Sequence, residues 1–254
     1  MIDSRLDEQS EGWARRVAFE KYLEALEIKN LNEPKFGVTS LRLAASKAGL
    51  GIIRTNNFFY TENGSSITIN AWLIDKELEL IDSVELKKCP QHCGKCIEAC
   101  PTKALSAPFT TSLFDCVSFI TTLSVSKGMG LPSAKHQREI GCRIYGCDAC
   151  QDACPFNKNK WQGGRDFPGL NEIAKNLLPK NIMAMNYSEM ASVLAPKFWY
   201  ISVPNLWKWK INALIAMSNG YCDAYEEPIK LGLIDTNRRV RHLAKQICKK
   251  HAIK

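Results

Sequence analysis

No stretch of the 254-residue sequence approaches the roughly 20 consecutive apolar residues that a membrane-spanning helix needs. The opening residues, MIDSRLDEQSEGW, are polar and acidic, so no secretory signal is visible. Histidine is scarce, because the chain has four histidines and no two of them have the spacing of a paired metal site. No glycine-rich fingerprint for a flavin or nicotinamide nucleotide occurs. We therefore expect a protein that does not bind membranes and that uses neither a histidine metal site nor a nucleotide cofactor.

Cysteine, by contrast, is abundant, with eleven residues in the chain. Without a secretory signal, this number favours metal ligation in a reducing compartment over a framework of disulfides. The apolar content of 45% and the charged content of 24% are ordinary for a globular protein. These properties predict a cytoplasmic protein whose thiols bind metal.

Seven of the cysteines lie in two short runs, and both runs end in a Cys-x3-Cys-Pro tail. The runs are Cys89-x3-Cys93-x2-Cys96-x3-Cys100-Pro101 and Cys147-x2-Cys150-x3-Cys154-Pro155. In two-cluster ferredoxins the closely spaced cysteines wrap one iron–sulfur cluster, while the cysteine before the proline ligates the other cluster. Structural zinc also uses Cys-x2-Cys pairs, but it does not require the tail. The two runs therefore predict two iron–sulfur clusters.

Hydrophobic periodicity outlines the remaining chain. We expect helices over residues 4–28 and from Thr39 or Ser40 to Gly49. The segment 58–74 reads as two strands joined as a hairpin around an Asn63-Gly64 turn.

The chain beyond residue 169 has a helical pattern, with apolar stripes that predict stacked helical pairs of the HEAT type. Two stripes carry this prediction: Trp207, Ile211, Leu214 and Ile215, and then Val240, Leu243, Ala244 and Ile247.

Several segments, in this order, resemble the epoxyqueuosine reductase family over about residues 40–254. They are AASKAGLG, CGKCIEACPTKAL, DCVSFITTLS, GCRIYGCDACQDACPFNK and KINALIAMSNG. That family is cobalamin-dependent, carries two 4Fe–4S clusters and performs the last step of queuosine synthesis in tRNA. It is related to the reductive dehalogenases.

The resemblance implies an α+β fold with three regions. Residues 1–84 would be a shortened N-terminal α/β region, the remnant of an α/β cofactor domain. Residues 85–160 would form a double 4Fe–4S, ferredoxin-like domain. Residues 161–254 would form an α-helical, HEAT-like region, and the turn-rich segment 161–169 marks the boundary before it.

The resemblance also implies which cysteines share a cluster. The cluster nearer the corrinoid would take Cys100, the isolated Cys116, Cys147 and Cys150. The other cluster would take Cys89, Cys93, Cys96 and Cys154. Cys89 stands one residue further from Cys93 than the family pattern has it, a difference that a loop can absorb. Cys142, Cys222 and Cys248 receive no ligand role and are interpreted as ordinary buried or surface thiols.

The corrinoid side of the resemblance is weaker. Gly51 and Asn56 stand in the segment that the family places against the cofactor. Arg54, however, replaces a family glycine there, either filling cofactor space or lying at the surface of a rearranged loop. Counting back without gaps puts Lys35 where the family has its proton-donating aspartate, with Glu33 the nearest carboxylate. We therefore expect this chain to bind cobalamin weakly or not at all.

Two functions from different classes remain open. In the first, the chain is an iron–sulfur redox protein whose clusters carry single electrons to a redox partner protein or to a corrinoid. In the second, it is a cobalamin-dependent epoxyqueuosine reductase, an oxidoreductase acting on tRNA. Only the second class would make the chain an enzyme.

The C-terminal quarter is a candidate surface for tRNA. From residue 196 onward there are eleven Lys and Arg against four Asp and Glu, which gives a net charge of +7 of the chain's +8. The basic residues expected to face solvent are Arg238, Arg239, Arg241, Lys245 and Lys249. Trp207 and Trp209 are nearby as stacking surfaces for bases. The alternative is a solvated helix face that only keeps the protein soluble.

Overall fold

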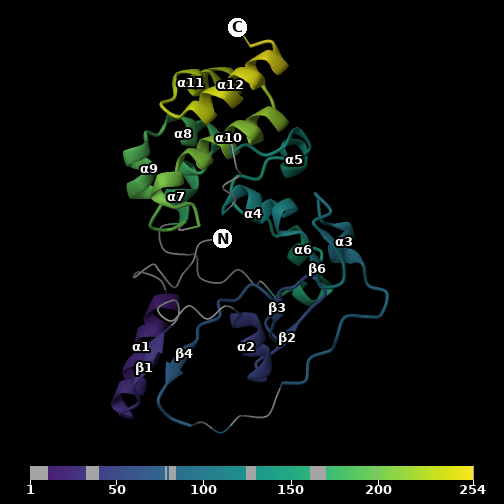
Figure 1. Cartoon of the computed structure of the whole chain (residues 1–254), viewed down its shortest axis with the longest axis vertical. Coiled ribbons are helices and arrows are strands. Elements are labelled where there is room, and N and C mark those ends of the chain that lie inside the picture. Colours follow the sequence, from purple (N-terminus) through teal and green to yellow (C-terminus); the bar gives the residue numbers. More distant parts are fainter. Residues whose placement is uncertain are drawn as a thin grey trace.

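The computed structural model describes residues 11–32, 40–77, 79, 84–123, 130–160, 170–198 and 200–253. Helices dominate and the strands are short, in line with an α+β fold (Figure 1). The N-terminal elements lie at one end, the cysteine-rich elements in the middle and the helices of the C-terminal part at the other end (Figure 1). No helix in these described ranges is both long and apolar enough to cross a membrane.

The described residues of the N-terminal part form two helices and four short strands. They are α1 (Glu11–Ala25), β1 (Asn30–Asn32), α2 (Leu41–Lys47), β2 (Ile52–Ile53), β3 (Phe59–Tyr60) and β4 (Trp72–Ile74). Helix α2 begins after Ser40 and is followed by Gly49 with a positive φ, as the sequence predicts. Residues 4–10 of the predicted first helix, and Lys35 and Glu33, lie outside the described residues.

The predicted hairpin over residues 58–74 is wrong. Strand β3 pairs antiparallel with β2, and β4 pairs antiparallel with β1, so the two strands do not pair with each other. The turn itself is present, with hydrogen bonds in both directions between Thr61 and Gly64 and a φ of 87° at Gly64. The turn does not join two paired strands. Instead, the amide of Ser65, directly after it, donates to Asn157 Oδ1 at 2.9 Å. The turn therefore anchors this segment to the residues that follow Cys154.

Where the structure describes it, the cysteine-rich part consists of short helices and one two-stranded sheet. They are α3 (Lys95–Glu98), β5 (Leu105–Ala107), β6 (Thr110–Thr111), the 3-10 helix η1 (Leu113–Asp115), α4 (Val117–Thr121), α5 (Ala134–Ile140), α6 (Ala149–Asp152) and η2 (Pro155–Asn157). Strands β5 and β6 are antiparallel neighbours. Helices α3 and α6 pack against each other and carry the central cysteines of the two runs.

The C-terminal part is helical throughout its described residues. Its elements are α7 (Leu170–Asn176), α8 (Pro179–Ala184), α9 (Tyr187–Val193), η3 (Val203–Asn205), α10 (Trp207–Asn219), η4 (Asp223–Tyr225), α11 (Glu226–Leu231), η5 (Gly232–Ile234) and α12 (Arg238–His251). Helix α10 lies at the centre and packs against α8, α12 and α5 (Figure 1). The segment 161–169, expected to be a boundary, lies outside the described residues.

The single apolar stripe predicted at Trp207, Ile211, Leu214 and Ile215 underestimates how much of this helix is buried. Helix α10 is buried on all faces from Trp207 to Ser218, including Lys208 and Lys210. Burial lowers the pKa of Lys208 to about 8. Helix α12 keeps the predicted pattern, because Val240, Leu243, Ala244 and Ile247 are all buried. A helix surrounded by other helices needs no polar face, whereas α12 lies at the surface and exposes one of its faces to solvent.

Candidate iron–sulfur sites

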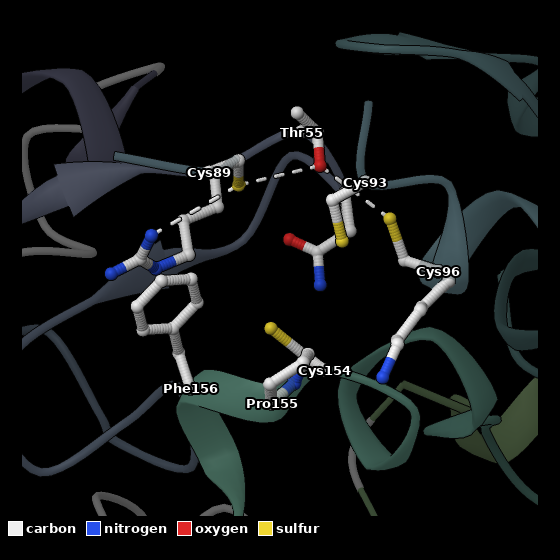
Figure 2. A pocket seen from close by; sticks show the side chains of 10 residues that line it. Thr55, Cys89, Cys93, Cys96, Cys154, Pro155 and Phe156 are labelled. Atoms are coloured by element: carbon white, nitrogen blue, oxygen red, sulfur yellow. Dashed lines mark hydrogen bonds between the residues drawn. The ribbon is translucent and has the colours of Figure 1, made fainter. Parts of the chain in front are cut away.

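Two pockets each gather four cysteine side chains. One pocket has a volume of about 270 Å³, including the space at its opening to solvent. It is lined by Cys89, Cys93, Cys96 and Cys154, here called the first quartet. Figure 2 shows their sulfur atoms around a common space. Cys100, Cys116, Cys147 and Cys150, here called the second quartet, line another pocket of about 500 Å³ counted in the same way. None of the eight thiols is in a disulfide.

The quartets exchange one cysteine between the two runs. Cys154 belongs to the second run but lies in the first pocket, and Cys100 belongs to the first run but lies in the second pocket. The local cause is the proline that follows each of these cysteines. Pro155 starts the 3-10 helix η2, and Cys154 before it is extended, with φ −79° and ψ 121°. The chain therefore leaves α6 at Cys154 and directs this side chain across to the first pocket.

Cys89 reaches the first pocket despite its unusual spacing. The amide of Cys93 donates to the carbonyl of Pro90 at 3.1 Å, which forms a turn between the two cysteines. This turn absorbs the extra residue that separates Cys89 from Cys93. Cys116 reaches the second pocket from the start of helix α4, where it is the N-terminal cap with φ −68° and ψ 122°.

The first pocket contains hydrogen-bond donors directed at sulfur. The hydroxyl of Thr55 lies 3.6 Å from Cys89 Sγ and 3.5 Å from Cys96 Sγ (Figure 2). Arg54 donates from a guanidinium nitrogen to Cys89 Sγ at 3.9 Å. Burial acts to raise the pKa of Cys89, but hydrogen bonds from Thr55 and the charge of Arg54 outweigh it and hold this pKa below its ordinary value. The pocket therefore favours a thiolate at Cys89.

The second pocket differs from the first, because no charged side chain of the described part of the chain lines it. Burial raises the pKa of Cys150 to about 12, and the neighbouring Cys147, Cys116 and Cys100 add to the rise because their thiolates would repel its own. Burial likewise raises the pKa of Cys147. Four thiolates this close are stable only with cations among them. Iron supplies that positive charge in a cluster.

The donor sets fit clusters better than single ions. Within the described ranges, no three His, Cys, Asp or Glu side chains converge closely enough to hold one metal ion. Each quartet instead lines a pocket with four sulfur atoms, the number that a 4Fe–4S cluster requires.

Asn56 lies between the two pockets and lines both of them. It is 4% exposed. Its side-chain amide donates to the Tyr60 hydroxyl at 2.8 Å and to the Cys150 carbonyl at 3.2 Å. Tyr60 is itself fully buried, and burial followed by its contact with Cys154 raises its pKa above the ordinary value. Asn56 is thus a shared lining residue that lies between the pockets of the first and second quartets.

Gly51 and Asn56, the two residues predicted to bind a corrinoid, both contact other residues of the protein. A Cβ atom at Gly51 would lie 2.1 Å from the Tyr60 carbonyl oxygen, so glycine is required there by the close approach of β3. Gly51 is buried, and Asn56 faces the cysteine pockets. Their role toward a corrinoid stays a prediction.

The structure corrects one of the two interpretations of Arg54, and the other, that it fills cofactor space, stays a prediction. Its side chain is 4% exposed, so it is not a surface arginine. It lines the first cysteine pocket, with its guanidinium 3.5 Å from the centre of the Phe156 ring. No sequence pattern indicates this contact or the contacts of Thr55 with sulfur, because Arg54 and Thr55 are more than thirty residues away from the cysteines they contact.

The cysteines without a ligand role lie outside both pockets. Cys142 and Cys222 are exposed, and Cys248 is buried in the core of the C-terminal helices. Burial raises the pKa of Cys248, which suits an inert thiol.

The basic surface of α12 differs from its prediction at one position. Arg238, Arg241, Lys245 and Lys249 are exposed, as expected. Arg239 is half-buried, with its guanidinium 4.6 Å from the centre of the Trp207 ring. Trp207 and Trp209 are 5% and 0% exposed, so the prediction that they stack on bases is wrong. Trp209 instead stacks on Tyr145 within the helical core.

Residues 88–157 match the 4Fe-4S double cluster binding domain family. This range contains both quartets, and the match confirms the prediction of two 4Fe–4S clusters.

Sequence comparison relates the chain to epoxyqueuosine reductases. The epoxyqueuosine reductase of Bacillus subtilis (strain 168) is 34% identical over 194 residues, which cover 72% of this chain and 45% of that protein. The epoxyqueuosine reductase of Staphylococcus aureus (strain NCTC 8325 / PS 47) is 29% identical over 226 residues, covering 86% of this chain and 55% of that protein. The chain thus spans about half the length of these curated relatives.

Two solved structures have a similar fold over almost the whole chain. A crystal structure of selenomethionine-labelled epoxyqueuosine reductase matches with a TM-score of 0.76 and 26% identity, covering 94% of this chain and 62% of that chain. A crystal structure of epoxyqueuosine reductase with a tRNA-Tyr epoxyqueuosine-modified tRNA stem loop matches with a TM-score of 0.76 and 25% identity, over the same shares. Sequence and fold together make this chain a relative of the epoxyqueuosine reductases that contains a 4Fe–4S double cluster binding domain.

Proposed function

We propose that this chain is an electron-transfer protein in which each cysteine quartet ligates one 4Fe–4S cluster and the clusters carry single electrons to a redox partner protein or a corrinoid. The observation that carries the proposal is the sorting of the eight cysteines into two pockets of four. A cytoplasmic location, where thiols stay reduced, belongs to the same proposal.

The chain's own residues supply the path and the surroundings for the electrons. Because Asn56 lines both pockets, the walls of the two sites meet at one side chain. Thr55 and Arg54 direct donors at the sulfurs of the first quartet. Hydrogen bonds and burial around the sulfurs are the means by which a protein sets cluster potential. The clusters, when bound, supply the one-electron chemistry.

The wild-type chain, purified and reconstituted without oxygen, is expected to hold about eight irons and about eight sulfides, four of each for every cluster. Reduction with dithionite should produce the electron paramagnetic resonance (EPR) signal of reduced 4Fe–4S clusters. Iron, sulfide and zinc analysis of the same sample checks the count. Stoichiometric zinc without sulfide would contradict the proposal.

A second candidate is an epoxyqueuosine reductase acting on tRNA with a corrinoid. One observation favours a tRNA contact: a structural relative was crystallised with a modified tRNA stem loop, and the fold match to it covers 94% of this chain. The exposed face of α12, formed by Arg238, Arg241, Lys245 and Lys249, offers a row of cations for phosphates. Against the full activity stands the engagement of Gly51 and Asn56 by protein atoms.

Folded tRNA is expected to bind this chain with an affinity that falls steeply as salt rises. Replacing Arg238, Lys245 and Lys249 together by alanine should lower the slope of log affinity against log salt by about 0.7–0.9 for each phosphate that the protein then fails to neutralise. Fluorescence anisotropy with labelled tRNA over a series of salt concentrations measures this slope.

The matched control removes three exposed cations at the other end of the molecule: Arg15, Lys21 and Lys47. It changes the net charge equally and should alter the slope much less. A wild-type chain that does not bind tRNA at low salt, or two triple variants with the same slope, would show that α12 is only a solvated surface.

A further inference from the structure

A buried guanidinium stands at the wall of the first cysteine pocket. Arg54 is 4% exposed, and one of its nitrogens lies 3.9 Å from Cys89 Sγ. Its guanidinium carbon lies 3.5 Å from the centre of the Phe156 ring and 5.0 Å from that of Tyr60. Aromatic faces attract a cation, more strongly where water is excluded. The two rings therefore fix the charge of Arg54 against the first quartet.

This charge has no carboxylate partner among the described residues. No ion pair formed within those ranges includes Arg54, and its Nε atom is buried without a hydrogen-bond partner. A buried charge is costly unless a charge of opposite sign lies close to it. The negative charge available at this place is that of the thiolates of the first quartet and of a cluster bound to them.

Among the described residues, no cation lines the pocket of the second quartet. The described lining residues of that pocket are uncharged apart from its thiols, whereas the first pocket contains Arg54 and the exposed Lys95. The charge of Arg143 partly opposes the burial that raises the pKa of Cys147, but Arg143 is not among the described lining residues of the pocket. It also donates to the Ile140 carbonyl at 3.1 Å. The two sites thus differ in their electrostatic surroundings.

We propose that Arg54 raises the reduction potential of the cluster of the first quartet above that of the second, so that the first cluster receives the electron in the half-reduced protein. The inference rests on the proposed ligand assignment. Reduction adds one electron from an external one-electron donor to the cluster, and no bond is formed or broken. The added negative charge is stabilised by a fixed cation close to sulfur, and burial strengthens this interaction because water screens it less. The Thr55 hydroxyl, near two sulfurs of the same quartet, acts in the same direction.

The test is a potentiometric titration followed by EPR on the reconstituted 254-residue chain. The variants are Arg54→Gln, which removes the charge, and Arg54→Lys, which keeps it. Arg42→Gln is the matched control, because Arg42 is exposed and donates to the Asn57 carbonyl of the same loop. The reduction steps are assigned to the two quartets with Cys96→Ser and Cys150→Ser, which each remove one cluster.

Arg54→Gln should lower the ratio of reduced to oxidised first cluster by about tenfold at a fixed solution potential, which is about 59 mV for a one-electron couple. The second cluster should shift less, and Arg54→Lys and Arg42→Gln should stay near wild type. An unchanged first step in Arg54→Gln, or equal shifts in both steps, would overturn the inference.

If Arg54→Gln does not retain the first cluster, Arg54→Lys decides the matter. Retention of this cluster at a near-native potential supports a role for the charge. Loss of the cluster from the lysine variant as well would show that the pocket requires the shape of arginine, and the inference would fail. A wild-type chain without any cluster signal would instead refute the proposed function itself.

Discussion

Replacing Cys154 by serine is expected to remove the first cluster and to leave the second, although Cys154 belongs to the second cysteine run. The side chain of Cys154 lines the pocket of Cys89, Cys93 and Cys96. Losing one of four thiolates leaves an iron without its protein ligand, so the iron content should fall from about eight to about four per chain. Cys100→Ser should remove the opposite cluster, because Cys100 lines the second pocket.

Variants of Cys96 and Cys150 show which cluster has been lost. Cys96 belongs to the first run and lines the first pocket, and Cys150 belongs to the second run and lines the second pocket. The EPR spectrum of Cys154→Ser should match that of Cys96→Ser, and the spectrum of Cys100→Ser should match that of Cys150→Ser. Cys142→Ser and Cys222→Ser serve as controls, because these exposed thiols lie outside both pockets and should keep the full iron content. Matching spectra for Cys154→Ser and Cys150→Ser would show that each run holds its own cluster.

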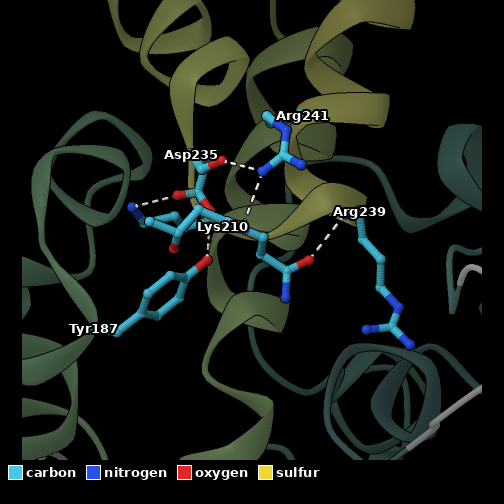
Figure 3. A network of polar contacts seen from close by, with 7 residues as sticks. Tyr187, Lys210, Asp235, Arg239 and Arg241 are labelled. Atoms are coloured by element: carbon cyan, nitrogen blue, oxygen red, sulfur yellow. Dashed lines mark hydrogen bonds and ion pairs between the residues drawn. The ribbon is translucent and has the colours of Figure 1, made fainter.

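Asp235→Asn is expected to lower the free energy of unfolding by about 3–5 kcal/mol, because it leaves a buried lysine without its counterion. Asp235 and Lys210 are each 7% exposed, and their charged atoms are 2.8 Å apart. The other carboxylate oxygen of Asp235 accepts from the Tyr187 hydroxyl and from the Asn237 amide, both at 2.7 Å. This network joins α9, α10 and the start of α12 (Figure 3). Asparagine has nearly the same shape, so the change isolates the charge.

Urea denaturation followed by circular dichroism measures this loss. The double variant Lys210→Met with Asp235→Leu should recover part of it, because removing both charges also removes the cost of burying them. Glu227→Ala breaks the exposed pair of Glu227 with Lys230 and should change the midpoint little. An Asp235→Asn variant as stable as Glu227→Ala would mean that the Lys210 charge is satisfied without Asp235.

Local features of the fold followed from residue types and spacing. Ser40 and Gly49 correctly bounded α2, because the start and stop of a helix depend on the residues at its ends. The apolar stripe of α12 was correct because this helix has one protected face. The cysteine runs specified 4Fe–4S clusters, since the spacing of ligands within a few residues is fixed by the chain itself. The grouping of Cys116 with the second quartet needed the family resemblance.

Contacts between distant segments required the folded chain. The pattern of residues 58–74 identified strands but not their partners, because a strand pattern is the same whichever neighbour it meets. The spacing of apolar residues predicted a single apolar stripe on α10, yet packing buries this helix on every side, including Lys208 and Lys210. Arg54 looked like a displaced surface residue or an obstacle to a cofactor. Its place beside Cys89 depends on a loop that meets the cysteine turn and Phe156 only in three dimensions. The sequence thus determined which metal clusters the chain holds, while tertiary packing decided the charges and hydrogen bonds around them, because those come from residues far apart in the chain.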